Sequence, residues 1–205
     1  MSKLSEISLK PWIIFDLFVL CFLLPVNFFY LLIWGVRFKF PFYSFGIPLI
    51  RRARGSSIVL GKGVEIRNGT WANVIGIDHR TCLSTRSRGA EIIIGNNVGI
   101  SGGSIVAAKS IHIGDNVLIG ANCLIIDNDF HSINPEGRRY GNTNIGIEPV
   151  IIEDNVFIGT KSIILKGSVI GKNSIIGAGS IVSGKIPPNS IAFGNPIRIK
   201  SKIRI

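Results

Sequence analysis

An aliphatic side chain recurs every six residues toward the end of this 205-residue chain. The series runs through Ile152, Ile158, Ile164, Ile170, Ile176 and Val182. Four positions after each of the first five stands a small or modest side chain: Val156, Ser162, Ser168, Ser174 and Ser180. This period fits neither the helical repeat of about 3.6 residues nor the alternation of a half-buried strand, but it suits a chain that turns regular corners. It predicts a parallel β-solenoid in which the repeated aliphatic residue points inward from each flat face.

The same spacing occurs upstream, with one irregularity. It includes Ile94, Ile100 and Val106, followed by Ile113, Ile119 and Ile125. The interval of seven from Val106 to Ile113 predicts one extra residue in that coil. Glycines follow several inward positions, at Gly95, Gly114, Gly120, Gly159, Gly171 and Gly177. We expect these glycines at corners, where the backbone needs freedom from the restrictions of a Cβ atom.

Breaks in the pattern divide the chain into three parts. Residues 1–57 form an apolar segment and connector, residues 58–186 the solenoid, and residues 187–205 a basic tail. Between residues 67 and 91 the pattern blurs, so it assigns no coils there. A polar loop at residues 127–149 interrupts the regular coils. In the tail, Ile197, Ile199, Ile203 and Ile205 alternate with basic residues, which predicts a strand with one basic face.

The N-terminal segment is apolar enough to meet a membrane. Leu17 to Val36 contains no charged residue and is about as long as the roughly 20 residues that cross a bilayer as a helix. Trp12, Tyr30 and Trp34 lie near its ends, as interfacial anchors do. Pro25 also allows a re-entrant hairpin, and a helical cap packed on the solenoid end or in a subunit contact is a further alternative. More basic residues follow the segment than precede it, which places the solenoid in the cytoplasm.

The charge and the cysteine content narrow the classes of molecule that the protein is expected to bind. The net charge of +11 is concentrated before residue 68 and after residue 184, which favours anionic partners such as lipid headgroups or phosphorylated ligands. Nucleic acid is disfavoured, because the sequence has no recognition module or aromatic stacking platform. Cys21, Cys82 and Cys123 lack metal-ligand spacing and are expected to be reduced, with Cys123 at an inward small position. We expect no metal.

The polar loop carries the candidate chemistry. It contains His131, Asp127 and Asp129, and loops on rigid scaffolds are common places for reactive groups. An imidazole with an ordinary pKa of about 6.5 is mostly neutral at cytoplasmic pH and can accept a proton. We therefore predict that His131 is a general base. Asp127 or Asp129 is expected to hold its other ring nitrogen and stabilise the imidazolium, as an acid does in catalytic triads.

Three motifs together resemble those of the hexapeptide-repeat sugar O-acetyltransferases, a family that includes galactoside and maltose acetyltransferases and enzymes of surface polysaccharide synthesis. The motifs are the hexads, the loop from Asn128 to Pro135 with Arg138 seven residues after the histidine, and the closing sequence from Ser180 to Arg198. The resemblance covers about residues 92–200. It implies an all-β, left-handed parallel β-helix, an exception to the usual right-handed crossover, and a homotrimer with active sites between subunits.

The resemblance also implies acetyl-CoA as the co-substrate. The positions carried over from the family for its binding are Thr160, Ala178, Ser183, Gly184, Lys185 and Arg198. Small residues let the pantetheine arm approach backbone amides, and cations meet the phosphates. The family often has a lysine at the position of Gly184, whereas here Lys185 follows one residue later. For each Ser, Thr or Ala in this set, a corner residue of the repeat is the alternative interpretation.

The acceptor is predicted to be a sugar hydroxyl. Ser101 is a candidate contact for it, and Arg138 and Arg139 beside the base suit a sugar that bears phosphate, such as a lipid-linked or nucleotide-linked sugar. A membrane anchor favours the lipid-linked kind. We therefore predict direct acetyl transfer in O-antigen, capsule or exopolysaccharide synthesis, at the cytoplasmic face of a bacterial inner membrane. His131 removes the hydroxyl proton, and a backbone amide near Thr160 receives the developing oxyanion.

Other functions remain open at this stage. One is N-acetyl transfer to an amino nucleotide-sugar, and another is a noncatalytic scaffold that holds partners on a membrane. Serine acetyltransferases carry a large helical N-terminal domain that residues 1–57 cannot supply. The solenoid carbonic anhydrases hold zinc with three histidines, but His79, His112 and His131 lack the close pair that such a site needs.

Overall fold

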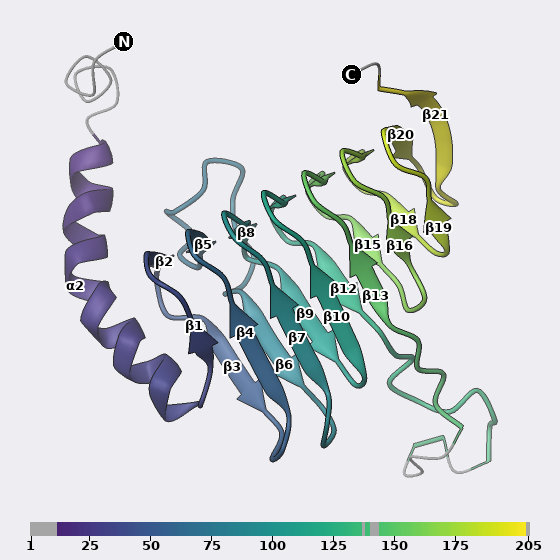
Figure 1. Cartoon of the computed structure of the whole chain (residues 1–205), viewed down its shortest axis with the longest axis horizontal. Coiled ribbons are helices and arrows are strands. Elements are labelled where there is room, and N and C mark those ends of the chain that lie inside the picture. The colour runs from purple at the N-terminus through teal and green to yellow at the C-terminus, as the bar shows by residue number, and fades with distance from the viewer. Residues whose placement is uncertain (1–11, 137, 140–143, 204–205) are drawn as a thin grey trace.

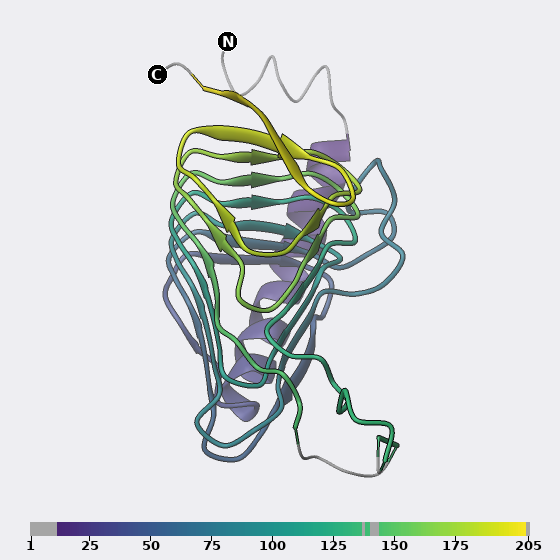
Figure 2. The same ribbon diagram turned by 90° about the vertical axis from the view of Figure 1, so that its right-hand side faces the viewer.

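The computed structural model describes residues 12–136, 138–139 and 144–203. Within them the chain forms one helix, α2 (Trp12–Ile33), followed by short strands that wind into stacked coils (Figure 1). Each coil contributes one strand to each of three sheets, so strands β1 to β20 pair in parallel with strands three places away along the chain. Seen along the stack, the coils superpose around a common interior (Figure 2). The predicted parallel β-solenoid is confirmed.

The first sheet has the order β1-β4-β7-β10-β13-β16-β19. Its strands are β1 (Arg37–Phe38), β4 (Ser57–Leu60), β7 (Glu91–Ile94), β10 (Ser110–Ile113), β13 (Val150–Ile152), β16 (Val169–Ile170) and β19 (Lys185–Ile186). The third sheet has the order β18-β15-β12-β9-β6-β3. Its strands are β3 (Leu49–Arg52), β6 (Cys82–Thr85), β9 (Ser104–Ala107), β12 (Leu124–Ile126), β15 (Ile163–Ile164) and β18 (Ile181–Val182).

The second sheet has the order β2-β5-β8-β11-β14-β17-β20-β21. Its strands are β2 (Phe42–Phe45), β5 (Val64–Arg67), β8 (Gly99–Ser101), β11 (Leu118–Ile119), β14 (Phe157–Ile158), β17 (Ile175–Ile176), β20 (Ser190–Phe193) and β21 (Arg198–Lys202). β21 is the strand predicted in the tail. It pairs antiparallel with β20 and closes the C-terminal edge of this sheet.

The interior of the stack is filled by the repeated aliphatic residues. Ile158, Ile164 and Ile170 are each fully buried, and so are the serines at the predicted small positions. The buried hydroxyls donate to backbone carbonyls: Ser162 to Gly177 at 3.1 Å and Ser168 to Val182 at 3.1 Å. A buried hydroxyl without a partner would destabilise the fold, so these bonds explain why serine is tolerated inside.

The inward position in β9 differs from the prediction. Ile105 is fully buried and aligns with Ile125, whereas Val106 is half-buried on the outer face. The corner at Gly102 is one residue short, so the interval from Ile100 to the next inward residue is five. The prediction that Val106 points inward is therefore wrong, because two adjacent aliphatic residues both fit the pattern.

The repeated glycines serve a different purpose from the one expected. Gly114, Gly159 and Gly171 do not have positive φ, but a Cβ at each would collide with backbone atoms of the next coil. Their role is close stacking of coils. From the third coil on, positive φ at the corner between the first and second sheets comes from asparagines. These asparagines also form a ladder: Asn155 Nδ2 donates to Asn173 Oδ1 at 3.0 Å and Asn173 Nδ2 to Asn189 Oδ1 at 2.8 Å.

The solenoid begins earlier than the expected connector allowed. Strands β1, β2 and β3 pair with β4, β5 and β6, so residues 37–52 form the first coil and not a linker. Its positions that pair with the inward residues Leu60, Ile66 and Leu83 of the next coil are Phe38, Ser44 and Ile50, so the spacing of six is kept but the side chains differ. The first coil closes one end of the stack and packs against Leu31 of the helix, so its residue types differ from those of the inner coils.

Helix α2 covers the N-terminal end of the stack and contacts β2 (Figure 1). It runs without interruption through Pro25, so the described residues do not form a re-entrant hairpin. The helix is long and apolar enough to cross a membrane by length and composition. At the same time it packs on the solenoid end, as the cap alternative expected.

Candidate functional site

The polar loop leaves the stack at the corner between the third and first sheets. It starts after β12, returns at β13 and projects from the stack of coils (Figures 1 and 2). Its two arms are tied together at the base, because Asp129 N donates to Gly146 O at 3.0 Å and Glu148 N to Asp127 O at 2.9 Å. The neck of the loop is therefore ordered by backbone hydrogen bonds.

Asp127 anchors this neck and does not face His131. Its carboxylate is fully buried and accepts backbone N–H groups of Ala108 and Lys109, both at 2.7 Å. It also accepts Nδ2 of Asn128 at 2.9 Å. Charge-assisted bonds of this kind satisfy the buried carboxylate and fix the neighbouring coil corner. The first of the two aspartates predicted to orient the base is thus a structural residue in this chain.

Asp129 is engaged in an ion pair with the following coil. Its Oδ1 lies 2.8 Å from Nζ of Lys166, and both side chains are largely buried. The backbone carbonyl of Asp129 accepts the N–H of His131 at 2.7 Å, whereas its carboxylate pairs with Lys166. In the single chain, neither Asp127 nor Asp129 therefore orients the imidazole, as was predicted for one of them.

The imidazole of His131 is oriented by a backbone carbonyl instead. Its Nδ1 lies 3.3 Å from the carbonyl oxygen of Arg138. A carbonyl only accepts, so this contact requires the proton on Nδ1 and leaves the lone pair on Nε2. His131 is exposed, which makes Nε2 accessible to a substrate. This tautomer is the one that a general base needs.

The side chain of Arg138 braces the loop. Its Nε donates to Ser132 O at 3.0 Å and its Nη2 to Ile133 O at 2.5 Å. The predicted substrate contact from this guanidinium therefore competes with a role inside the loop. Arg139 also lies in the loop, is exposed and has an interaction of its own.

A cationic groove adjoins the loop and was not predicted. Its volume is about 530 Å³, and its lining comprises Leu49, Arg51, Cys82, Ser84, Arg86, Val106 and Phe130. The guanidinium of Arg86 stacks 4.5 Å from the ring centroid of Phe130, the residue before His131. Burial raises the pKa of the Cys82 thiol, and the nearby Arg51 partly offsets this shift. The groove thus places two arginines beside the base of the loop.

The small residues predicted for the coenzyme border the outer face of the third sheet. Thr160 and Ala178 lie at successive levels of the corner before that sheet, where Thr160 Oγ1 donates to Ala121 O at 2.7 Å. Ser183 and Gly184 lie at the corner after it, the corner from which the loop emerges. Arg198 and Lys185 begin β21 and β19 and are exposed. The small residues therefore flank one sheet face at its two edges.

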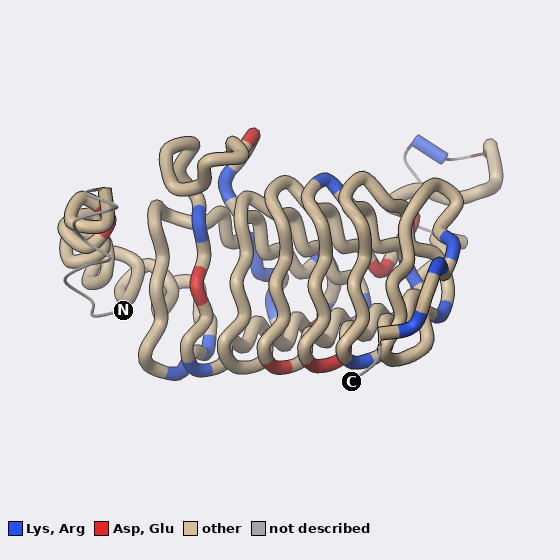
Figure 3. The backbone as a smooth tube through the Cα atoms, turned by 90° about the horizontal axis from the view of Figure 1, so that it is seen from above, with Lys and Arg blue, Asp and Glu red and all other residues tan. Residues whose placement is uncertain are grey.

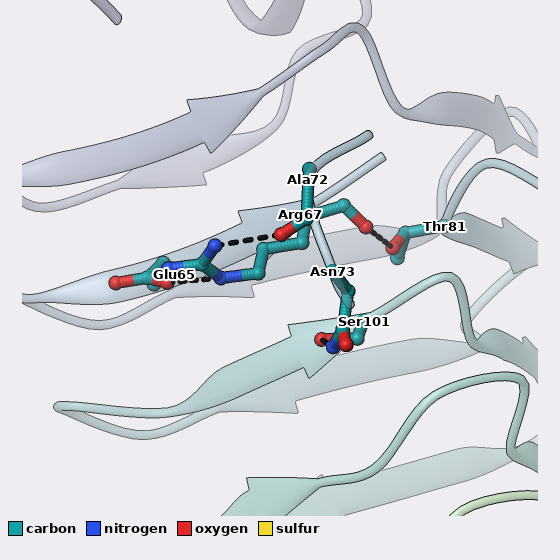
Figure 4. A network of polar contacts seen from close by, with 6 residues as sticks. All are labelled: Glu65, Arg67, Ala72, Asn73, Thr81 and Ser101. Carbon is teal, nitrogen blue, oxygen red and sulfur yellow. Dashed lines mark hydrogen bonds and ion pairs between the residues drawn. The ribbon is translucent and has the colours of Figure 1, made fainter. Parts of the chain in front are cut away.

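Ser101 lies away from this face, in the second sheet. Its Oγ accepts Asn73 Nδ2 at 3.0 Å and helps to hold the long corner between β5 and β6 (Figure 4). In the same network Arg67 donates to Glu65 Oε1 at 2.7 Å and to Ala72 O at 2.6 Å. Within one chain, the structure does not bring Ser101 next to His131.

The histidines outside the loop pair with other side chains. His112 Nε2 lies 2.8 Å from Glu91 Oε1, and His79 Nε2 lies 3.0 Å from Ser104 Oγ. Among the residues that the structure describes, no group of three His, Cys, Asp or Glu side chains is arranged to hold a metal ion.

Two segments match families of hexapeptide repeats. Residues 149–184 match the family described as "Bacterial transferase hexapeptide (six repeats)", and residues 110–126 match "Hexapeptide repeat of succinyl-transferase". The chain is 42% identical over 100 residues to a galactoside O-acetyltransferase of Lactococcus lactis and 41% identical over 100 residues to that of Escherichia coli. Each alignment covers 49% of this chain and 47% or 48% of the relative, so the chain spans about half the length of the curated relatives it matches.

A solved structure extends the comparison to most of the chain. A variant of AntD, an N-acyltransferase from Bacillus cereus in complex with dTDP and coenzyme A, aligns with a TM-score of 0.61 over 83% of each chain at 21% identity. At that identity the similarity shows the fold alone. Together these matches confirm the resemblance to the hexapeptide-repeat sugar O-acetyltransferases and the left-handed parallel β-helix.

Proposed function

We propose that this protein is an acetyl-CoA-dependent O-acetyltransferase that acts on a sugar hydroxyl. The observation that carries the proposal is His131, presented on the large loop of a regular hexapeptide helix with Nδ1 engaged and Nε2 accessible. The galactoside O-acetyltransferases that the chain resembles support the reaction class. Coenzyme A in a solved structure of the same fold supports the co-substrate.

The proposed reaction needs no covalent enzyme intermediate. Nε2 of His131 takes the proton from the sugar hydroxyl while its oxygen forms a bond to the thioester carbonyl carbon. A backbone amide at the Thr160 corner receives the oxyanion. The C–S bond then breaks, and the thiolate of coenzyme A takes the proton back from the imidazolium. Positioned general base catalysis of this kind contributes about 10² to 10⁴ in rate.

We place the active site between two copies in a homotrimer. His131 projects on its loop, whereas Thr160 and Ala178 lie at a different corner of the same chain, so a neighbouring copy brings the two sets together. Exposed apolar residues on the outer face of the second sheet, Leu118 and Phe157, give such a neighbour a surface to cover.

Complementation tests this arrangement. His131→Ala and Ala178→Trp, the latter chosen to block the pantetheine arm, are each expected to be inactive. Trimers assembled from a mixture of the two should recover about a quarter of the wild-type sites, because one site in four combines two intact halves. A mixture as inactive as its parents, in trimers shown to have exchanged, would place the site within one chain.

The acceptor is proposed to carry phosphate. Arg51 and Arg86 line the groove beside Phe130, directly before the proposed base, and their cations suit a phosphate or diphosphate. A lipid-linked sugar combines such a group with a membrane location, which supports a role in surface polysaccharide synthesis at the cytoplasmic face of a bacterial inner membrane.

The base is tested by His131→Ala with Asn134→Ala, another exposed residue of the loop, as the matched control. His131→Ala should lower kcat by at least about 100-fold while the trimer and coenzyme A binding by calorimetry stay intact. The assay compares neutral glycosides, polyprenyl-diphosphate sugars and amino sugars, so it separates O-acetylation from N-acetylation. Retained turnover in His131→Ala rejects the base, and failure to bind coenzyme A favours a noncatalytic scaffold.

A further inference from the structure

Helix α2 carries its polar side chains toward the protein and its apolar side chains outward. Asn27 is buried, and Asp16 and Tyr30 are half-buried on the side that faces the solenoid. The outer face includes Phe18, 61% exposed, and Phe22, 65% exposed. A helix that covers a protein in water shows the opposite arrangement. An apolar outer face of this extent is what a lipid-facing helix presents.

Contacts join the helix to the solenoid from its first turn to just past its last residue. Near its start, the Phe15 ring meets Trp71 edge-on with centroids 5.5 Å apart. Further along, Asn27 Nδ2 donates to Gly46 O at 3.2 Å. Just past its end, Arg52 Nε donates to Trp34 O at 2.7 Å. At about 1.5 Å per residue, the contacts from Phe15 to Trp34 span roughly 28 Å.

These contacts are incompatible with a helix that spans the membrane. The hydrocarbon core of a bilayer is about 30 Å thick, so a helix that crossed it would carry the first coil and the corner at residues 68–81 into lipid. That region contains Ser44, Asn68 and Arg67 together with irregular backbone. Irregular backbone facing lipid is not tolerated, because its polar groups have no water to bind.

A helix lying in the plane of the membrane keeps this irregular backbone out of the lipid. Only its outer face enters the boundary between headgroups and acyl chains, to a depth of about 5 to 10 Å, and the fastened face stays with the protein. Figure 1 shows that α2 runs across the end of the stack, so the coils extend away from the face that the helix exposes. The same end also exposes Val74 fully, beside Trp71 and Phe15, which enlarges the apolar surface.

Basic residues surround this end of the molecule. Arg37, Arg54 and Lys62 are exposed in the first two coils, and Figure 3 shows Lys and Arg along these coils. At a coil spacing of about 4.8 Å, they lie within about one Debye length of a surface at the helix. Such cations favour a leaflet rich in anionic lipid over a neutral one.

We infer that α2 is a monotopic anchor whose outer face lies in an anionic leaflet, with the β-helix standing away from the membrane. The inference rests on the membrane location proposed above and not on acetyl transfer. Its tests therefore use no acetylation assay, so a failure of the anchor and a failure of the enzyme activity remain distinguishable. A second copy of the chain is the alternative cover for the apolar face.

Side-specific labelling separates an in-plane helix from a spanning one. The background variant replaces Cys21, Cys82 and Cys123 with serine, which already occupies the positions equivalent to Cys123 in later coils. Ser5→Cys and Ser201→Cys are then exposed to a membrane-impermeant maleimide in spheroplasts and in inverted vesicles. An in-plane helix predicts that both label only in inverted vesicles. Labelling of Ser5→Cys from the outside of spheroplasts overturns the inference.

Vesicle flotation tests the lipid-facing surface. The full chain should bind vesicles of phosphatidylethanolamine and phosphatidylglycerol, and less strongly those of phosphatidylcholine alone. Phe22→Glu should weaken binding at least about tenfold, since it removes a large apolar side chain that the lipid would bury. Ile199→Glu is the matched control, an exposed apolar residue at the opposite end of the stack, and should bind as the parent does. Unchanged binding of Phe22→Glu, with or without a change in oligomeric state, refutes the lipid contact.

Discussion

Replacing Gly159 with alanine should destabilise the β-helix through the contact between coils and not through backbone strain. Gly159 does not have positive φ, so alanine can adopt its conformation. An added Cβ, however, would lie 2.8 Å from Ala178 Cα and 2.9 Å from Gly177 C, both backbone atoms of the next coil. Carbon atoms in contact normally stay about 3.5 to 4.0 Å apart, so the two coils must separate by roughly 1 Å.

That separation would break hydrogen bonds between the coils. Gly159 N donates to Ile176 O at 2.7 Å, and Gly179 N donates to Thr160 O at 2.8 Å. Lengthening each by about 1 Å takes it beyond the usual range of about 2.7 to 3.2 Å. Two lost bonds at about 0.5 to 1.5 kcal/mol each, with some loss of packing, amount to about 2 to 3 kcal/mol. For a chain of this length we expect Tm to fall by about 4 to 12 °C.

Gly179 provides the matched control for this prediction. Its φ is +68°, and a Cβ there would meet nothing within 4 Å. Gly179→Ala should therefore cost only the strain of the left-handed conformation, about 1 to 2 kcal/mol. Gly179→Asn should cost less, because asparagine adopts this conformation at Asn173 and Asn189.

Circular dichroism at one fixed protein concentration measures the three melting temperatures. The expected order of destabilisation is Gly159→Ala, then Gly179→Ala, then Gly179→Asn. If Gly179→Ala melted below Gly159→Ala, or if Gly159→Ala melted with the parent, close stacking would not be the reason for the glycine.

Asp127→Asn should leave one buried backbone N–H without its acceptor and lower stability by about 1 to 3 kcal/mol, measured by thermal unfolding. Burial raises the pKa of the Cys123 thiol to about 11 from an ordinary 9.0. At about pH 8 its alkylation should be about 100-fold slower than that of a thiol with the ordinary value, while exposed Cys21 reacts; equal rates would contradict the burial. Because the folded state favours the neutral thiol, its contribution to stability should persist below pH 9 and be lost toward pH 11. Phe130→Leu should release the Arg86 contact and speed proteolysis of the loop, whereas Phe130→Tyr should not.

The repeating coils were predictable because each one encodes its own geometry. The residues predicted inward in the later coils, such as Ile158 and Ile164, are fully buried. The repeat predicts less where that independence ends. In the end coil closed by the helix, Phe38 and Ser44 stand where later coils have aliphatic residues, so the pattern did not reveal this coil. Nor could the pattern choose between Ile105 and Val106.

The candidate site was predictable only in part, for a different reason. The loop and His131 stand out because they interrupt the repeat. The group that orients the imidazole is the backbone carbonyl of Arg138. Every residue has such a carbonyl, so the sequence does not single this one out. Likewise Arg51 and Arg86 meet only because their coils stack, although 35 positions separate them in the chain.

The stacking of coils also fixes how far the loop stands from the helix. Four coils, from β1 to β12, separate α2 from the loop. At about 4.8 Å per spacing, the three spacings from the first layer to the fourth put the start of the loop that carries His131 roughly 14 Å beyond the first layer. The number of coils therefore sets the distance between the helix and the imidazole. Inserting or deleting one whole coil would change that distance by one coil spacing. Relatives of different coil number could thus reach the same bond in acceptors whose sugars stand at different heights.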